Sequence, residues 1–169
     1  SVDSPPTIYA DRILFGAQDG CVYCLRAVDG VLMWRFRAAP AELHTVAHGQ
    51  VASVWPVHGS VLMRQTLAGP RVYFAAGRSG HLDGGIQVFA LDPVTGMVCH
   101  QERIALPHPR GSERTDRATA HRMPGAFPDV FVAHGDHAFM RHIRFDESCQ
   151  QQEDAPGEAL VASCGMLDD

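Results

Sequence analysis

The sequence predicts an all-β protein built from repeated antiparallel meanders, and three observations indicate this fold class. Short apolar runs alternate with tight-turn sequences that contain glycine and aspartate. Residues 71–100 repeat the pattern of residues 12–34, which is typical of a radial or stacked repeat architecture. Residues 86–91 are apolar on both faces, as a strand must be when its sheet is covered on both sides.

The composition bounds the class of protein. With 169 residues, 46% of them hydrophobic, the chain is long enough for one globular domain with a sizeable core. The net charge is −5 and charges of both signs are interspersed, which argues against a nucleic-acid-binding surface. No apolar run reaches the roughly 18 residues of a spanning helix, so no membrane span is predicted.

The first repeat is assigned to residues 7–37 and is expected to be a three-stranded meander. The pair Pro5 and Pro6 before it favours an extended lead-in over a helix. The turn sequences Gln-Asp-Gly and Val-Asp-Gly then separate three apolar runs. The expected strands are residues 12–17, 21–27 and 31–37.

The second repeat is assigned to residues 51–104 and follows a less regular stretch at residues 38–50. The second halves of the two repeats match at a constant offset of 66 residues, whereas their first strands are offset by 59. The second copy therefore carries seven extra residues, which fall in the glycine-rich loop at residues 77–85. The matched pairs are Val22 and Val88, Tyr23 and Phe89, Leu25 and Leu91, and Gly30 and Gly96. The expected strands are residues 51–55, 60–63, 71–76 and 86–91.

A tight turn, DPVTG, follows the last of these apolar runs. Pro93 suits the second position of a type I turn, and Gly96 can take the left-handed conformation that closes a hairpin loop. Asp92 can accept hydrogen bonds from backbone N–H groups in the turn. In the first repeat, Trp34 follows the matching Gly30 by four residues, and its ring can cover the neighbouring meander. These residues are predicted to be structural.

The remainder of the chain is expected to hold an insertion and a weaker third repeat. Residues 107–125 contain four arginines and almost no large apolar side chain, which predicts an exposed loop. Residues 127–146 are assigned to the third repeat, with a strand, an HGD turn and a second strand, HAFMRHIRF. Residues 158–169 are expected to begin a further strand.

The turn motifs resemble the pyrroloquinoline-quinone (PQQ) type of β-propeller repeat, in which an ALDxxTGxxxW consensus closes each blade. The segment FALDPVTGMVCH matches the aspartate, Thr95 and the glycine, with His100 where the tryptophan stands. The segment GCVYCLRAVDGVLMW keeps the glycine and the tryptophan but has Arg26 for the aspartate and Asp29 for the threonine. Longer stretches are similar to large bacterial propeller proteins of unassigned activity, typical of planctomycete-like organisms: SVWPVHGSVL, VYFAAGRSGHLDGGIQVFALDP, FPDVFV, FMRHIRFD and GMLDD.

This resemblance implies an all-β propeller of about seven or eight four-stranded blades. At about 40 to 45 residues per blade, this chain supplies roughly three to four of them. The prediction is therefore a partial β-propeller whose partners are the remaining blades of the same ring. The resemblance also implies a location in the periplasm or the cell envelope.

The glycine-rich loop at residues 77–85 is the first candidate binding site. It presents Arg78, Ser79, His81 and Asp83. Glycines let the backbone approach a ligand, and an arginine can pair with a carboxylate or a phosphate. The loop is not a dinucleotide-binding fingerprint, because a strand follows it rather than a helix. The alternative interpretation is a structural loop in which the aspartate holds its own turn.

Arg141 and His142 form the second candidate, an anion site at the edge of a blade. If HAFMRHIRF is one strand, Arg141 and Ile143 share one face, while His142 and Arg144 share the other. The alternative is a set of solvated charges at a strand edge.

No metal site is predicted. Zinc needs three or four converging ligands, and the histidines lie in segments without helical periodicity or a HExxH frame. Cys21 and Cys24 have CxxC spacing but lie in an apolar strand, where positions three apart face opposite ways. They are interpreted as buried structural thiols. The histidines in question are His44, His48, His58, His134, His137 and His142.

The sequence has no GxSxG elbow and no recognisable nucleophile, so no catalytic residue is assigned. We expect a non-enzymatic propeller scaffold that binds a protein or a small ligand and needs no cofactor. One alternative is a fragment of a PQQ-dependent dehydrogenase, in which blades outside this chain hold PQQ and calcium. The resemblance gives that class adjacent cysteines, a stacking tryptophan and calcium-binding acids, which this sequence does not assemble. The other alternative is a propeller similar to outer-membrane assembly factors.

Overall fold

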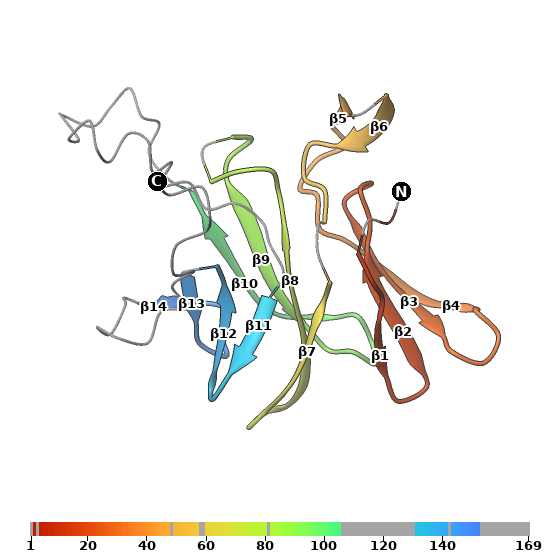
Figure 1. Cartoon of the computed structure of the whole chain (residues 1–169), viewed down its shortest axis with the longest axis vertical. Coiled ribbons are helices and arrows are strands. Elements are labelled where there is room, and N and C mark those ends of the chain that lie inside the picture. The colour runs from red at the N-terminus through yellow and green to blue at the C-terminus, as the bar shows by residue number, and fades with distance from the viewer. Residues whose placement is uncertain are drawn as a thin grey trace, which may run out of the picture.

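The computed structural model describes residues 2, 4–47, 49–57, 60–80, 82–105, 131–141 and 143–152 (Figure 1). These residues form fourteen strands, arranged in four sheets. They include no helix, and so none that is long and apolar enough to cross a membrane. The all-β class predicted from the sequence is confirmed.

Three of the sheets are four-stranded meanders in which each strand pairs antiparallel with the next strand along the chain. Most of the connections are tight turns of two to five residues, which can only join antiparallel neighbours. The first sheet contains β1 (Thr7–Tyr9), β2 (Arg12–Gly16), β3 (Cys21–Arg26) and β4 (Leu32–Arg37). The second contains β7 (Leu62–Thr66), β8 (Gly69–Ala76), β9 (Ile86–Leu91) and β10 (Val98–Ile104). The third contains β11 (Phe131–His134), β12 (His137–Met140), β13 (Ile143–Phe145) and β14 (Gln151–Gln152).

The first strands of the three sheets are neighbours in space. β7 contacts β1 on one side and β11 on the other. Thr7 Oγ1 donates a hydrogen bond to the carbonyl of Val61 at 2.5 Å, and Arg64 Nη2 donates to the carbonyl of Gly135 at 3.5 Å. Figure 1 shows the three sheets standing next to one another, the first on the right and the third on the left. Successive meanders that meet through their first strands make a partial β-propeller.

The second sheet is buried on both faces because its side chains alternate between two cores. Val72 and Phe74 of β8 belong to the core shared with the first sheet. Tyr73 and Ala75 belong to the core shared with the third sheet. Every residue of β9 is buried, which confirms the burial on both faces predicted for this run.

The sequence repeat is also a repeat in strand register. β3 and β4 have a register irregularity next to the pair Cys24 and Trp34. β9 and β10 have one next to the pair Ala90 and His100, which lies 66 residues further along the chain. A bulge at the same place in both sheets shows that equivalent residues can be compared one by one.

Two expectations about the first sheet and the segment after it need correction. The lead-in before Arg12 contains a short strand, β1, so the first sheet has four strands rather than three. Residues 38–50, expected to be irregular, include β5 (His44–Ala47), which pairs with β6 (Gln50–Ser53) in a separate hairpin. Residues 51–53 therefore belong to this hairpin and not to the second sheet, which begins at Leu62.

Long-range hydrogen bonds hold the hairpin against the first sheet. The Ser53 N–H donates to the carbonyl of Gln18 at 2.8 Å, and the Val57 N–H donates to the carbonyl of Ala17 at 3.1 Å. These bonds join residues far apart in the sequence, so the local pattern of apolar residues could not show that residues 51–53 pair in the hairpin rather than in the second sheet.

The segment HAFMRHIRF was also assigned incorrectly as one strand. Arg141 has a φ of 55°, which no strand tolerates, and it lies in a tight turn between β12 and β13. Arg141 and Ile143 therefore do not share a strand face. The insertion expected at residues 107–125 and the strand expected within residues 158–169 lie outside the described residues.

Candidate functional site

Two of the longer connections between strands lie at the same end of the sheets. The hairpin β5–β6 and the loop between β8 and β9 lie at the upper end in Figure 1, and the turn between β9 and β10 lies at the lower end. The indole Nε1 of Trp55, which follows the hairpin, donates to the carbonyl of Asp83 in the β8–β9 loop at 3.0 Å. The hairpin region and the β8–β9 loop are therefore in contact, and we call this end of the sheets the loop end.

Within the β8–β9 loop, the structure brings Arg78 and Asp83 together. Arg78 Nε and Nη2 donate to the same Asp83 carboxylate oxygen, at 3.0 and 2.6 Å. Asp83 reaches this position with a left-handed backbone, φ 54°, and its side chain is only 25% exposed. Ser79 is buried, and its carbonyl accepts a hydrogen bond from the Leu82 N–H at 3.3 Å. His81 lies outside the described residues.

The glycines of this loop face the protein's own backbone. A Cβ at Gly85 would lie 2.2 Å from the carbonyl oxygen of Ile104, and one at Gly77 would lie 3.0 Å from the carbonyl oxygen of Gly85. The sequence suggested that these glycines admit a ligand. In the structure, their missing side chains let the two ends of the loop pack against each other and against β10.

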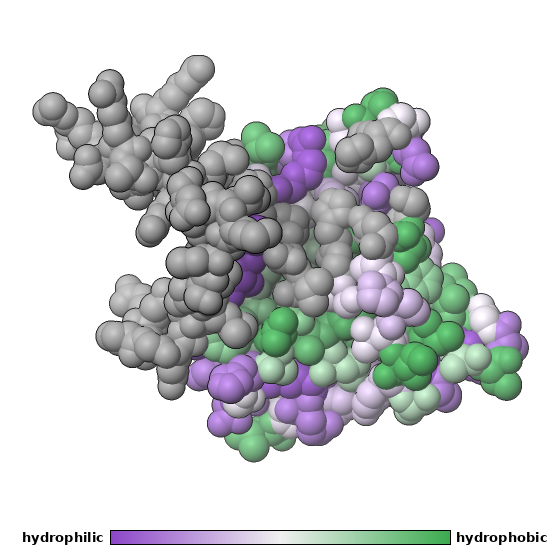
Figure 2. Space-filling view, viewed as in Figure 1, coloured by the Kyte–Doolittle hydropathy of each residue, from purple (hydrophilic) through white to green (hydrophobic). Residues whose placement is uncertain are grey.

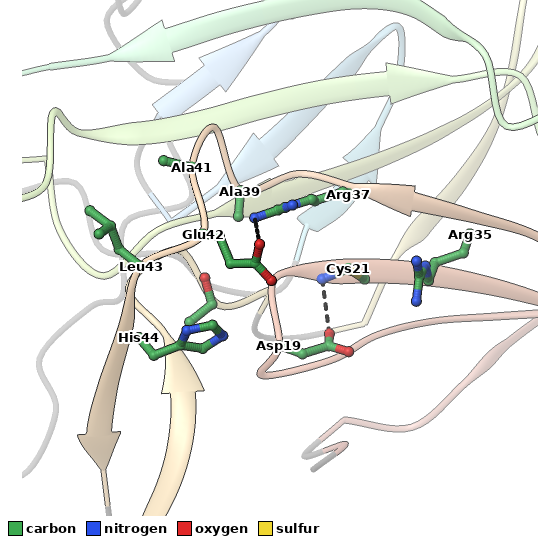
Figure 3. Close-up of a pocket in the computed structure, with 10 residues that line it drawn as sticks. Asp19, Cys21, Arg35, Arg37, Ala39, Ala41, Glu42, Leu43 and His44 are labelled. Carbon is green, nitrogen blue, oxygen red and sulfur yellow. Dashed lines mark hydrogen bonds and ion pairs between the residues drawn. The ribbon is translucent and has the colours of Figure 1, made fainter.

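A polar cavity of about 190 Å³ lies between the first sheet and the hairpin, and sequence reasoning missed it (Figure 3). Arg35 and Arg37 line it because alternate residues of β4 share a face. Arg37 Nη2 lies 3.9 Å from Glu42 Oε2, a long contact for an ion pair. The spacing RxR in an otherwise apolar strand is the signal that could have found this site. The other lining residues are Asp19, Cys21, Ala39, Ala41, Leu43, His44 and Ser53.

Asp19 organises the floor of this cavity. Its carboxylate accepts hydrogen bonds from the Cys21 N–H at 3.0 Å and from the Tyr23 hydroxyl at 2.5 Å. The bond to Asp19 raises the pKa of Tyr23 to about 12. Burial, aided by the charge of Asp19, raises the pKa of the Cys21 thiol, so this cysteine is protonated and a poor nucleophile at neutral pH.

The residues assigned to the repeat turn make contacts between the first two sheets. Trp34 Nε1 donates to the carbonyl of Pro93 at 3.1 Å, and its ring lies over Gly96, where an added Cβ would be 2.7 Å from it. Asp92 accepts hydrogen bonds from the N–H groups of Val94 and Thr95, both at 2.8 Å, and from the Thr95 hydroxyl. The Thr95 N–H is the largest of the contributions that lower the pKa of Asp92.

The contact between the second and third sheets uses a different donor. His100 stands where the first sheet has Trp34, and the inter-sheet bond comes instead from Tyr73. Its hydroxyl donates at 3.0 Å to the carbonyl of Glu147, which follows Asp146 as Pro93 follows Asp92. The same backbone acceptor is thus used at both interfaces.

The other residues considered in the sequence are Cys21, Cys24, Arg141 and His142, and the structure describes all of them except His142. Cys21 and Cys24 are free, buried thiols on opposite faces of β3. Arg141 lies at the β12–β13 turn, while His142 is outside the described residues. No three metal-ligating side chains converge among the described residues, which do not include His48, His58 or His142.

Comparisons with known proteins found similarity to solved structures. No family model and no curated protein matches the chain. The chain is similar to BamB from Moraxella catarrhalis, with 13% sequence identity and a TM-score of 0.41. The alignment covers 87% of this chain and 46% of that protein, so the chain spans less than half of its length.

Proposed function

We propose that this chain is part of a non-enzymatic propeller scaffold and that its loop end binds a partner protein. The observation that carries the proposal is the cross-strand pair Val46 and Val51, which are 73% and 71% exposed. Directly paired residues of antiparallel strands project from the same face, so the two side chains form one apolar surface. Figure 2 shows apolar residues at the top of the molecule, where Figure 1 places the hairpin.

Covering this pair would give a partner a useful driving force. Burial of one valine side chain contributes about 1.5–3 kcal/mol, so a partner that covers both gains a few kcal/mol from them. Leu43, at the start of the hairpin, is 54% exposed and extends the same region. Among the described residues, β5 pairs only with β6, which leaves a strand edge that an extended peptide can join.

The cavity beside the hairpin defines the polar part of the proposed partner. The side chain of Arg37 is 48% exposed, and its ion-pair partner among the described residues is Glu42, at the long distance of 3.9 Å. An incoming carboxylate can make shorter, charge-assisted bonds to such a guanidinium. The partner that fits is an extended segment that places an apolar side chain on the valine pair and an acidic side chain near Arg35 and Arg37.

The chemical groups of the loop end support a binding role over a catalytic one. Arg78 is engaged by Asp83, and the Cys21 thiol is protonated by virtue of its burial. Adding PQQ and calcium to the longer protein and assaying dye reduction with alcohols or sugars tests the alternative. Turnover there would overturn the scaffold proposal.

A photo-crosslinking experiment in the native cells tests the binding end. A photoreactive residue at Val46 is expected to capture one protein, and the substitution Val51→Asp is expected to abolish the capture. The matched control is Val28, which is 84% exposed in a turn at the opposite end of the first sheet. Equal capture of the same protein from Val28, or capture that survives Val51→Asp, would contradict the proposal.

We extend the proposal to a location in the periplasm or cell envelope, on the strength of the repeat motif that the sequence shares with exported propellers. Fractionation of cells that produce the longer protein tests it. Recovery in the cytoplasmic fraction alone would count against this location and leave the binding surface to be tested separately.

A further inference from the structure

The outer face of the first sheet, which points away from the second sheet, carries an apolar cluster next to Arg35, which pairs with Tyr23. Phe15 and Tyr23 stack on it with ring centroids 5.5 Å apart and an interplanar angle of 16°. Ile8, 72% exposed, pairs with Ile13 on the same face. Neither of the other four-stranded sheets packs here, and Figure 2 shows apolar side chains along this right-hand side of the molecule.

The second sheet shows what such a face is built to receive. Phe74 and Phe89, the counterparts of Phe15 and Tyr23, stack in the same way, with centroids 5.3 Å apart and an interplanar angle of 22°. Phe36 of the first sheet covers this pair edge-on, at 6.0 and 5.1 Å. The stack on the first sheet therefore has the same geometry for receiving an aromatic ring, and no ring of the described residues covers it.

A second equivalent position repeats this difference. Gly96 of the second sheet lies under the Trp34 indole, whereas an added Cβ at the matching Gly30 would meet no atom within 4 Å. Ala27 stands where Pro93 offers its carbonyl to Trp34. The first sheet thus has both features through which the second sheet packs against its neighbour, the aromatic stack and the glycine turn.

We propose that this face seats a further four-stranded blade of the same repeat, placed ahead of the first sheet. It would set a ring against Phe15 and Tyr23, and an indole over Gly30. A second copy of this chain does not supply these groups, because Trp34 and Phe36 are already packed against the second sheet. The outer strand of the third sheet offers glutamine, Gln152, at the register position of the indole.

A tandem chain tests this inference. Residues 1–61 are placed directly before residues 7–169 of a complete copy, because Thr7 and Leu62 hold the same register position in their sheets. In the complete copy, Ile8→Cys provides a thiol on the face in question. Its counterpart in the second sheet, Met63, is partly buried against the first sheet. We expect alkylation of this thiol to be at least about tenfold slower in the tandem than in the unextended chain carrying Ile8→Cys.

Two matched controls make the result specific. Leu67→Cys, at a fully exposed position in a turn of the second sheet, should react equally fast in both chains. Trp34→Ala with Phe36→Ala, in the added segment only, should restore fast alkylation at Ile8→Cys. Fast alkylation in the unmodified tandem, whether the added sheet fails to fold or fails to dock, overturns the proposal.

A concentration-dependent protection of Ile8→Cys in the unextended chain would also overturn it, since a second copy would then cover the face. The inference rests on the propeller arrangement and not on the partner of the loop end, so crosslinking at Val46 and alkylation at Ile8→Cys can fail independently.

Discussion

Replacing Gly96 by alanine should destabilise the protein more than replacing Gly30, although both glycines close equivalent turns. Their φ angles are nearly the same, 71° and 72°, so the backbone strain of an L-residue, about 1–2 kcal/mol, is common to both variants. Only at Gly96 does the new Cβ meet an obstacle, the Trp34 ring at 2.7 Å. Overpacking of this kind costs about 1–3 kcal/mol more.

The indole cannot simply withdraw, because its Nε1 is bonded to the carbonyl of Pro93 at 3.1 Å. We therefore expect a loss in the free energy of unfolding of about 1–2 kcal/mol for Gly30→Ala and about 2–5 kcal/mol for Gly96→Ala. In a Trp34→Ala background, the penalty for Gly96→Ala should fall to the Gly30→Ala value.

Urea unfolding of the unchanged protein, Trp34→Ala, Gly96→Ala and the double variant forms a double-mutant cycle that measures the coupling between residues 34 and 96. A coupling of about 1–3 kcal/mol is expected. Equal penalties for Gly30→Ala and Gly96→Ala, or a Gly96→Ala penalty that is unchanged without the indole, would refute the docking contact.

Three further predictions concern single groups. Folding lowers the pKa of Asp92, so the ionised carboxylate contributes to the free energy of unfolding above its unfolded pKa. This contribution is lost as the pH falls through the lower pKa of the folded state. In acid titrations monitored by circular dichroism, Asp92→Asn should therefore lose less stability below about pH 4 than the unchanged protein. Tyr73→Phe should cost about 1 kcal/mol in urea unfolding because it removes the bond to the Glu147 carbonyl, and an unchanged midpoint would contradict that bond. Burial raises the pKa of Cys149 to about 12, so mass spectrometry should find Cys99 alkylated before Cys149 at pH 8. The reverse order would show that Cys149 is accessible.

Much of the fold follows from local sequence features. The DPVTG turn, the glycine at position 30 and the apolar run at residues 86–91 predicted antiparallel meanders with a sheet covered on both faces. These features act over a few residues, since turn chemistry and side-chain alternation depend on neighbours along the chain. The resemblance between residues 12–34 and 71–100 extended this local information to a repeated architecture.

The candidate site was less predictable, because its geometry depends on contacts between distant segments. The sequence singled out Arg78 and Asp83 but not their pairing, and it gave no sign that Trp55 would bind the loop. Arg35 and Arg37 line a cavity only because the hairpin and the segment before it lie beside the first sheet.

What the sequence determined by itself is the unit: a short antiparallel meander with a glycine turn and apolar faces. What only the tertiary structure decided is which face meets which. Tyr23 and Phe89 are equivalent in sequence, yet Phe89 is buried under Phe36 and Tyr23 is partly exposed. The physical reason is that the burial of a side chain depends on the sheet packed against it, which comes from a distant part of the chain.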